Sequence, residues 1–253
     1  MKAVEVTGVK KLGNGKVVLE NVDMEVNEGE FVSIVGPQAC GKSTLLRLIA
    51  GLDQPDAGKI KILEEEVSKP HPKVGMIFQE TLLFPWLKII DNVTFGPISR
   101  GVEKVEAERE ATKWLESFGL AKFADKWPYE LSGGMQRRAT IAMMMVNQPK
   151  VLLCDELLGG LDLITRNAIA DEFLKLWHEK KPTVLYVTHL LEEAVYLSQR
   201  VYVMSAKPSK IYETFEIDLP EKRWEVPNLR FSEKCADYVN KVREAFVEAM
   251  KVA

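Results

Sequence analysis

The chain has 253 residues and a formal net charge of −3. This length can bury a full hydrophobic core, in one large domain or in a domain that carries an inserted subdomain. The nearly balanced charge gives no basic footprint and argues against nucleic acid as the main ligand. Three scattered cysteines indicate neither a disulfide framework nor a zinc cluster, and no apolar run is long enough to span a bilayer. We therefore expect a cytoplasmic protein without a signal peptide.

The first thirty residues alternate short apolar runs with turn glycines, which predicts antiparallel strands. A largely apolar, β-branched run before Gly36, over residues 31–35, then predicts a buried parallel strand, and the spacing of Leu45, Leu48 and Ile49 predicts a helix. The segment between this strand and this helix has the pattern G-x-x-x-x-G-K-[ST]. A chance glycine turn is the alternative reading, and the flanking strand and helix disfavour it.

The glycine-rich segment predicts a phosphate-binding loop for a nucleoside triphosphate. Backbone N–H groups at the start of a helix converge on polyphosphate, and the helix dipole adds positive potential there. Lys42 would reach the β- and γ-phosphates, and the Ser43 hydroxyl would hold Mg²⁺. The loop consists of Gly36, Pro37, Gln38, Ala39, Cys40, Gly41, Lys42, Ser43 and Thr44.

Downstream of the loop, the pattern predicts further strands, a helical region and a charged tail. Strands are expected over residues 59–63, 74–78, 151–154, 183–187, 200–204 and 210–217. The helix between the strands at 151–154 and 183–187 implies a parallel crossover. Helical spacing dominates residues 85–149, which we interpret as an inserted subdomain. We expect a main domain over residues 1–219 and a helical extension over residues 220–253.

Polar residues follow the ends of two apolar strands that we expect beside the phosphate loop. Asp155 and Glu156 come at the tip of one strand, and His189 lies just past the other. Ligands of open α/β sheets bind at the carboxyl ends of the strands. Asp155 fits Mg²⁺ ligation, Glu156 fits acceptance of a proton from an attacking water, and His189 fits contact with the γ-phosphate. Without the phosphate loop, a solvated strand end and a packed histidine would be the better interpretations.

The stretch Leu-Ser-Gly-Gly-Met-Gln-Arg-Arg over residues 131–138 resembles the signature sequence of ATP-binding cassette (ABC) proteins. The resemblance extends over nearly the whole chain in the family's order. It includes the phosphate loop, Gln79, the signature, Asp155-Glu156, Gly-Leu-Asp over residues 160–162, and His189.

The resemblance implies that two cassettes pair head to tail and share each ATP. Ser132, Gly133, Gly134 and Gln136 would then act on the partner's nucleotide, and Asp162 would link the two sites. Gln79 would touch Mg²⁺ and the attacking water. The catalytic set implied in this way is Glu156, His189, Lys42 and Gln79, and the metal set is Ser43, Gln79 and Asp155.

Within the family, the chain looks most like the importers of nitrate, sulfonate and taurine. The stretches that carry this likeness are Phe-Pro-Trp over residues 84–86, Asp-Asn-Val over residues 91–93, the eleven residues from Thr188, and Ile-Asp-Leu-Pro over residues 217–220. The implied partners are a second copy of the chain, integral membrane permeases and, indirectly, an extracytoplasmic solute-binding protein. The implied location is the cytoplasmic face of the cell membrane.

Several positions depart from the family pattern. Leu12 stands where the family places an aromatic residue that stacks on adenine, and Gln38 and Ala39 replace the usual Ser and Gly of the loop. Leu157 and Leu190 replace the usual Pro and Asp. None of these changes removes a reacting group, and Ala39 would be strained if its φ is positive.

We therefore predict an α/β fold with a P-loop NTPase parallel-sheet core, an N-terminal antiparallel β-subdomain and a helical insertion subdomain. The predicted function is MgATP hydrolysis that energises solute uptake through partner permeases. A soluble P-loop phosphotransferase is one alternative, and it would need an acceptor site but no signature. A non-transport ABC ATPase acting on nucleic acid or ribosomes is the other, and it would usually carry a second cassette or a long coiled coil.

Overall fold

The computed structural model describes residues 1–252, and it begins with the antiparallel strands that the alternating pattern predicts. The strands β1 (Lys2–Gly13) and β2 (Lys16–Asn27) pair in antiparallel fashion. On its other edge β1 pairs with β4 (Ala57–Ile62), followed by the short strand β5 (Glu65–Glu66). This sheet has the order β2-β1-β4-β5.

A second sheet holds the strand that leads into the phosphate loop. Its order is β10-β9-β3-β8-β7-β6, with β3 (Phe31–Val35) paired to parallel neighbours on both edges. The predicted parallel pairing of β7 and β8 is confirmed, and among the strands described in this sheet only β10 runs antiparallel. The other strands are β6 (Val74–Ile77), β7 (Val151–Asp155), β8 (Thr183–Val187), β9 (Arg200–Met204) and β10 (Ile211–Glu216).

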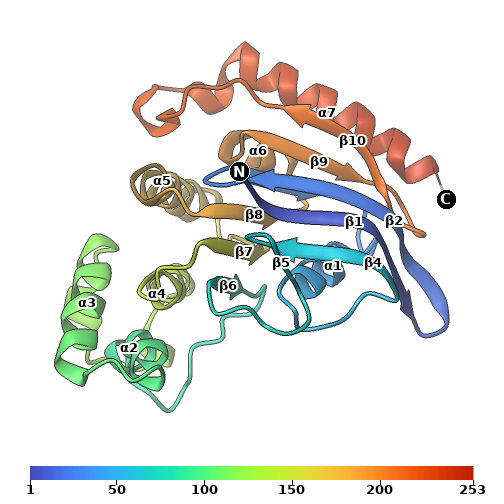
Figure 1. Ribbon diagram of the computed structural model, residues 1–253. Coiled ribbons are helices and arrows are strands. Elements are labelled where there is room, and N and C mark those ends of the chain that lie inside the picture. Colours follow the sequence, from blue (N-terminus) through green and yellow to red (C-terminus); the bar gives the residue numbers. More distant parts are fainter. Residues whose placement is uncertain (253) are drawn as a thin grey trace.

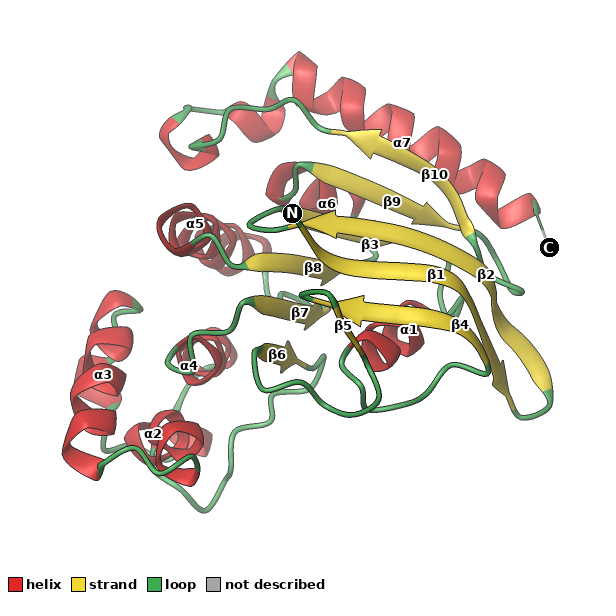
Figure 2. Ribbon diagram, in the orientation of Figure 1, coloured by secondary structure: helices red, strands yellow, loops and turns green. Residues whose placement is uncertain are grey.

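The two faces of β3 belong to two different parts of the core. Val32 and Ile34 join the cluster formed with helix α1 (Lys42–Ile49) and the antiparallel sheet. Figure 2 shows α1, in red, next to β4 of that sheet. Phe31 and Val35 join the cluster formed with the helices on the opposite face. Successive side chains of a strand point to opposite faces, so a strand buried on both sides is expected to be apolar at nearly every position. In β3 only Ser33 is polar, and it too is buried.

Three α-helices and two short 3-10 helices lie between β6 and β7, where the sequence predicts a helical region. They gather at one side of the molecule in Figure 1, although β6 and β7 themselves are paired neighbours. Gly119, with φ of 68°, follows the end of α3 as a left-handed terminator and donates its N–H to the Glu116 carbonyl at 2.9 Å. The elements are α2 (Ile89–Ser99), α3 (Lys104–Ser117), η1 (Ala121–Phe123), η2 (Pro128–Glu130) and α4 (Gly133–Met145).

The remaining helices pack on one face of the second sheet and along its other edge. After β10, the chain continues over the sheet into a long amphipathic helix, drawn in red in Figure 1. This is the helix that the charged tail predicts. No helix within residues 1–252 combines the length and the apolar character that crossing a membrane needs. The elements are α5 (Leu163–Lys180), α6 (Leu191–Leu197), η3 (Arg223–Glu225), η4 (Leu229–Phe231) and α7 (Glu233–Lys251).

Candidate nucleotide-binding and hydrolysis site

The phosphate loop connects β3 to α1, as the motif requires. No side chain caps the start of α1 within the described residues, so the N–H groups of its first turn can bind an anion. Lys42 is buried, and its Nζ donates to the carbonyl oxygens of Gly36 and Pro37, both at 2.9 Å. The ammonium group is thereby held inside the curve of the loop.

Two glycines of the loop have no room for a side chain. A Cβ on Gly36 would lie 2.9 Å from the Met204 carbonyl oxygen at the end of β9. Gly41 has φ of 124°, and a Cβ there would lie 2.8 Å from the Leu19 side chain on β2. The second contact shows that the β1–β2 hairpin lies directly against the loop.

Ala39 has φ of 58°, so the strain expected from the sequence is present. A left-handed conformation is costly for residues that carry a Cβ, and glycine avoids that cost. The neighbouring Cys40 is buried, with only 2% of its surface exposed, and it packs in the cluster between α1 and the antiparallel sheet. Its Sγ also accepts a long contact from the Lys42 ammonium at 4.0 Å, so the thiol lies inside the loop.

Asp155 ends β7 next to the phosphate loop. Its carboxylate is buried, one of its oxygens (Oδ1) has no hydrogen-bond partner within the described residues, and the Ser43 hydroxyl lies against the group. Burial raises the pKa of the Asp155 carboxyl, and the Ser43 hydrogen bond opposes that rise. A buried carboxylate oxygen without a partner, beside a hydroxyl at the start of a phosphate-binding helix, suits a hard divalent cation such as Mg²⁺.

The Glu156 carboxylate contacts two residues, Gln79 and His189, that lie far from it in the sequence. Its Oε2 accepts a hydrogen bond from the Gln79 side-chain amide at 3.0 Å, and its Oε1 lies 3.2 Å from Nδ1 of His189. Its backbone has φ of 47°, and its N–H donates to the Val187 carbonyl at 2.9 Å. The carboxylate thus lies at the carboxyl ends of β7 and β8, between the Gln79 loop and His189.

The signature residues begin helix α4. The Ser132 hydroxyl accepts the Met135 N–H at 3.3 Å, which makes Ser132 the N-cap. A Cβ on Gly134 would lie 2.7 Å from the Thr165 side chain of α5, so this glycine allows close helix packing. Gln136 uses its side-chain amide within the chain, donating to the Pro128 and Leu131 carbonyls at 2.9 and 3.1 Å.

The signature does not meet the phosphate loop of its own chain. Helices α4 and α1 lie apart in Figure 1, and no hydrogen bond joins these two groups of residues within the described part of the chain. Asp162 caps α5, since its Oδ1 accepts the N–H groups of Ile164 and Thr165 at 3.0 Å each. Hydrogen bonds from Thr165 lower the pKa of the Asp162 carboxyl.

Arg137 lies in the signature helix α4, and the sequence alone predicts no role for it. Its guanidinium is buried and donates to the backbone carbonyls of Phe78 and Gln79. Arg137 therefore ties α4 to the loop that carries Gln79. Apart from its place within the signature stretch, the sequence gives no sign of this contact, because the partners of Arg137 are backbone atoms some sixty residues away.

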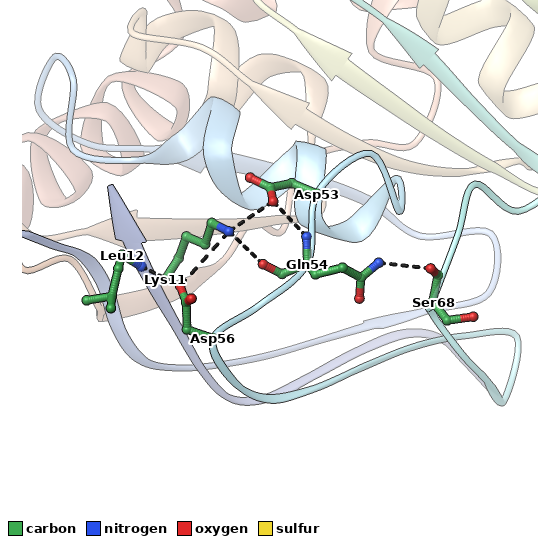
Figure 3. Close-up of polar contacts among 6 residues, drawn as sticks. All are labelled: Lys11, Leu12, Asp53, Gln54, Asp56 and Ser68. Atoms are coloured by element: carbon green, nitrogen blue, oxygen red, sulfur yellow. Dashed lines mark hydrogen bonds and ion pairs between the residues drawn. The ribbon is translucent and has the colours of Figure 1, made fainter. Parts of the chain in front are cut away.

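Leu12 stands near the turn of the β1–β2 hairpin, with 43% of its surface exposed. Figure 3 shows how polar contacts hold this position. The Leu12 N–H donates to Asp56 at 2.6 Å, while the Lys11 ammonium reaches Asp53 at 2.9 Å and the Gln54 carbonyl at 2.7 Å. The Lys11 ammonium holds the pKa of the Asp53 carboxyl below its usual value. The backbone at Leu12 is therefore held in place, and the side chain that it presents is aliphatic instead of aromatic.

A phosphate loop at the end of a parallel strand, beside the acidic tip of a nearby strand of the same sheet, defines a P-loop nucleoside triphosphatase. A family model described as ABC transporter matches residues 19–159, more than half of the chain. The chain belongs to the ABC transporter family, binds ATP and is an ATPase.

Relatives of known name match most of the chain. An uncharacterized ABC transporter ATP-binding protein of Methanocaldococcus jannaschii is 42% identical over 239 residues, which cover 94% of this chain and 89% of the relative. The aliphatic sulfonates import ATP-binding protein SsuB of Bacillus cereus is 39% identical over 247 residues, which cover 96% of this chain and 95% of the relative.

Two solved structures share the fold. One is a dimeric structure of a bacterial ABC transporter cassette, with a TM-score of 0.75 and 30% sequence identity, covering 86% of this chain and 100% of that chain. The other, with the same values, is a dimeric post-hydrolysis state of such a cassette bound to ADP and Pi. The fold class predicted from the sequence is thereby confirmed.

Proposed function

We propose that this chain is the ATP-hydrolysing subunit of an importer, which energises uptake of a small solute through separate membrane permeases. The observation that carries the proposal is the carboxylate of Glu156, held between Gln79 and His189 at the same sheet edge as the phosphate loop. A positioned carboxylate beside a triphosphate site can accept a proton from an attacking water.

In this proposal the residues around the phosphates have separate tasks. Glu156 takes the proton of the attacking water, and Gln79 orients the carboxylate by its amide hydrogen bond. Lys42 provides positive charge at the β- and γ-phosphates, for which it would exchange a carbonyl contact for a phosphate oxygen. His189, with more than half of its side chain exposed, remains free to contact the γ-phosphate.

Asp155, Ser43 and Gln79 are the residues that would hold Mg²⁺. The buried Oδ1 of Asp155, without a partner among the described residues, the adjacent Ser43 hydroxyl and the oxygen of the Gln79 side-chain amide are all oxygen donors of the kind that Mg²⁺ prefers. When bound, the ion would neutralise charge that develops on the phosphate oxygens. The burial that raises the pKa of Asp155 is also the reason why a cation would be favourable there.

We propose that two copies pair head to tail, with Ser132, Gly133, Gly134 and Gln136 of one copy facing the phosphate loop of the other. The distance of α4 from α1 within one chain supports this arrangement, as does the dimeric state of the two solved relatives. Asp162, at the exposed start of α5, would lie between the two sites.

A group of aromatic side chains supports a membrane permease as partner. Trp86 and Phe95 are exposed by 69% and 46%, and both contact Phe84, at ring distances of 5.6 and 4.7 Å. These rings lie a few residues beyond Gln79 and on α2. Exposed apolar groups of this kind mark protein interaction surfaces, and this one is placed to connect a partner to the hydrolysis site.

The solute proposed for the importer is a small anion of the nitrate, sulfonate or taurine type. The likeness to the aliphatic sulfonate import protein of Bacillus cereus supports this choice. This subunit would lie at the cytoplasmic face of the membrane, and the transporter would receive its solute from an extracytoplasmic binding protein.

The test is the substitution Glu156→Gln, with Glu116→Gln on the exposed face of α3 as the matched control. We expect release of inorganic phosphate to fall by roughly 10²- to 10⁴-fold, the usual contribution of a positioned base. ATP binding, measured by filter retention of labelled ATP, should stay within a few-fold of wild type. Wild-type turnover in Glu156→Gln would contradict this role, and a phosphorylated acceptor in place of free phosphate would favour a phosphotransferase.

A further inference from the structure

The residues that follow β10 take no part in the chemistry proposed above, yet they make specific polar contacts with α5 and α6. We call residues 220–251 the C-terminal extension. It contains η3, η4 and α7, and Figure 1 shows it lying beyond β9 and β10 on the side of α6. Three of its arginines reach α5 or α6.

Arg223 binds the C-terminal end of α6. Only 3% of its surface is exposed, and its guanidinium donates to the carbonyls of Tyr196, Ser198 (2.9 Å) and Val195 (3.4 Å). Burial lowers the pKa of Arg223 to about 10, so the group stays cationic at neutral pH. The last carbonyls of a helix lack partners within the helix, and a cation there also complements the helix dipole. Arg223 therefore fixes the end of α6.

Arg230 links α6 to α5. Its Nη2 donates to Asp171 Oδ1 at 2.6 Å, and its guanidinium carbon lies 3.3 Å from the centre of the Tyr196 ring. The Tyr196 hydroxyl donates to the same Asp171 oxygen at 2.7 Å. Burial raises the pKa of Tyr196, so its hydroxyl remains a donor. One carboxylate of α5 thus binds both a residue of α6 and a residue of the extension.

The other end of α6 holds the histidine of the hydrolysis site. His189 lies two residues before the first residue of the helix, and Thr188 accepts the Leu190 N–H at 3.1 Å. The Thr188 hydroxyl is hydrogen-bonded to the buried Glu193 in the first turn of the helix. At 1.5 Å per residue the seven-residue helix is only about 10 Å long, so a shift at one end displaces the other.

We propose that the C-terminal extension clamps α6, and that Arg223 is a positioning residue for His189. The extension would hold the helix in the one orientation that places the histidine beside Glu156. This inference rests on the proposed role of His189 in turnover. It assigns to Arg223 an effect on the rate of hydrolysis, not on nucleotide affinity, because its hydrogen bonds outside the extension go to carbonyls at the end of the helix that follows His189.

The main test compares Arg223→Met and Arg223→Lys with wild type in steady-state ATPase assays. We expect kcat to fall about tenfold in Arg223→Met while KM for ATP stays within twofold, a loss in the range of long-range coupling. Arg223→Lys keeps the cation and should recover part of the rate. Lys241→Met, an exposed cation on α7, is the matched control and should keep wild-type kcat.

A double-mutant cycle separates positioning from general destabilisation. If Arg223 acts through His189, Arg223→Met should cause no further loss of kcat in a His189→Ala background. Equal fold losses in both backgrounds, or wild-type kcat in folded Arg223→Met, would overturn the proposal. Wild-type kcat in His189→Ala alone would instead overturn the role of His189 itself, so the two failures are distinguishable.

A second variant covers the case in which Arg223→Met does not fold. Tyr196→Phe removes only the hydroxyl that binds Asp171 and keeps the ring under Arg230. We expect a fall in kcat of a few-fold, with an unchanged KM and no effect in the His189→Ala background. A folded Tyr196→Phe variant with wild-type kcat would count against the clamp.

Discussion

The Gln79 amide donates a hydrogen bond to the Glu156 carboxylate at 3.0 Å, although 77 positions separate the two residues in the chain. The loop that carries Gln79 is itself held by Arg137, which donates to the Gln79 carbonyl. A movement of the helical region that contains Arg137 would therefore reach the carboxylate through two hydrogen-bonded contacts. This connection gives a physical route between a partner bound at α2 and the hydrolysis site.

The first prediction concerns Gln79. Gln79→Ala removes the donor that orients Glu156, so we expect kcat for ATP hydrolysis to fall by about 10- to 100-fold. The KM for ATP should change little, because the phosphate loop is untouched. Glu80→Gln, the neighbouring exposed position, serves as the control in the same phosphate-release assay. A wild-type kcat in Gln79→Ala would show that Glu156 needs no such orientation.

The second prediction exploits the burial of Asp155. Asp155→Asn should abolish Mg²⁺-dependent hydrolysis. It should also raise the free energy of unfolding of the nucleotide-free protein by about 1 kcal/mol, because it removes a buried charge that has an unpaired oxygen among the described residues. Urea unfolding at several pH values is the measurement.

The pH dependence of that difference follows from the direction of the pKa shift. The folded pKa of Asp155 is raised above its unfolded value, so charging the carboxylate costs stability as the pH rises through and above the unfolded value. The gain in the free energy of unfolding from Asp155→Asn should therefore be full at neutral pH. It should vanish at acid pH, where the wild-type aspartic acid and the asparagine are both neutral. A difference that is independent of pH would mean that the charge is not its cause.

The third prediction concerns the left-handed Ala39. Ala39→Gly should raise the free energy of unfolding by about 0.5 to 1 kcal/mol, because glycine adopts φ of 58° without a Cβ clash. Ala124→Gly is the matched control, since Ala124 has a right-handed φ of −54° and should lose about as much stability. Chemical denaturation measures both. Stability changes of the same sign would show that the strain at Ala39 is negligible.

The fourth prediction tests base recognition at Leu12. Leu12→Tyr should tighten ATP binding by about 1 kcal/mol if an aromatic ring there stacks on adenine. The hairpin contacts in Figure 3 involve the Leu12 backbone and the neighbouring Lys11, so the substitution leaves them in place. Leu52→Tyr, another exposed leucine, is the control. Unchanged ATP and GTP affinities in equilibrium titrations would mean that the base is held elsewhere.

The fifth prediction tests sharing of the site between two chains. Lys42→Ala removes the cation at the phosphates, and Ser132→Arg blocks the signature by bulk and charge, so each homodimer should be inactive. In a mixed dimer both lesions fall on one ATP site, and the other site keeps an intact Lys42 and Ser132. Some ATPase activity should therefore return on mixing.

Crosslinking that identifies mixed dimers controls this mixing experiment. Activity that stays at the single-mutant level although mixed dimers form would argue against a shared site with independent turnover. Substantial activity of Ser132→Arg alone, over a series of protein concentrations, would contradict the shared site directly.

The sequence by itself determined the local elements and the types of residue in the site. Largely apolar runs predicted the buried strands β3, β7 and β8, because neither face of a strand covered on both sides is exposed to water. The loop motif predicted a triphosphate site at residues 36–44, and the polar residues at the strand ends predicted that Asp155, Glu156 and His189 lie at one edge. These signals are local in the chain, which is why a single sequence carries them.

Only the tertiary structure decided which of these residues meet. It joined Gln79 and His189 to opposite oxygens of Glu156, tied Arg137 to the Gln79 loop, and left α4 away from its own phosphate loop. It also placed Arg223 on the carbonyls of α6. The partners in the Arg137 and Arg223 contacts are backbone atoms, and backbone atoms are the same in every residue. Such contacts leave no pattern in the sequence, so they become visible only once the chain is folded.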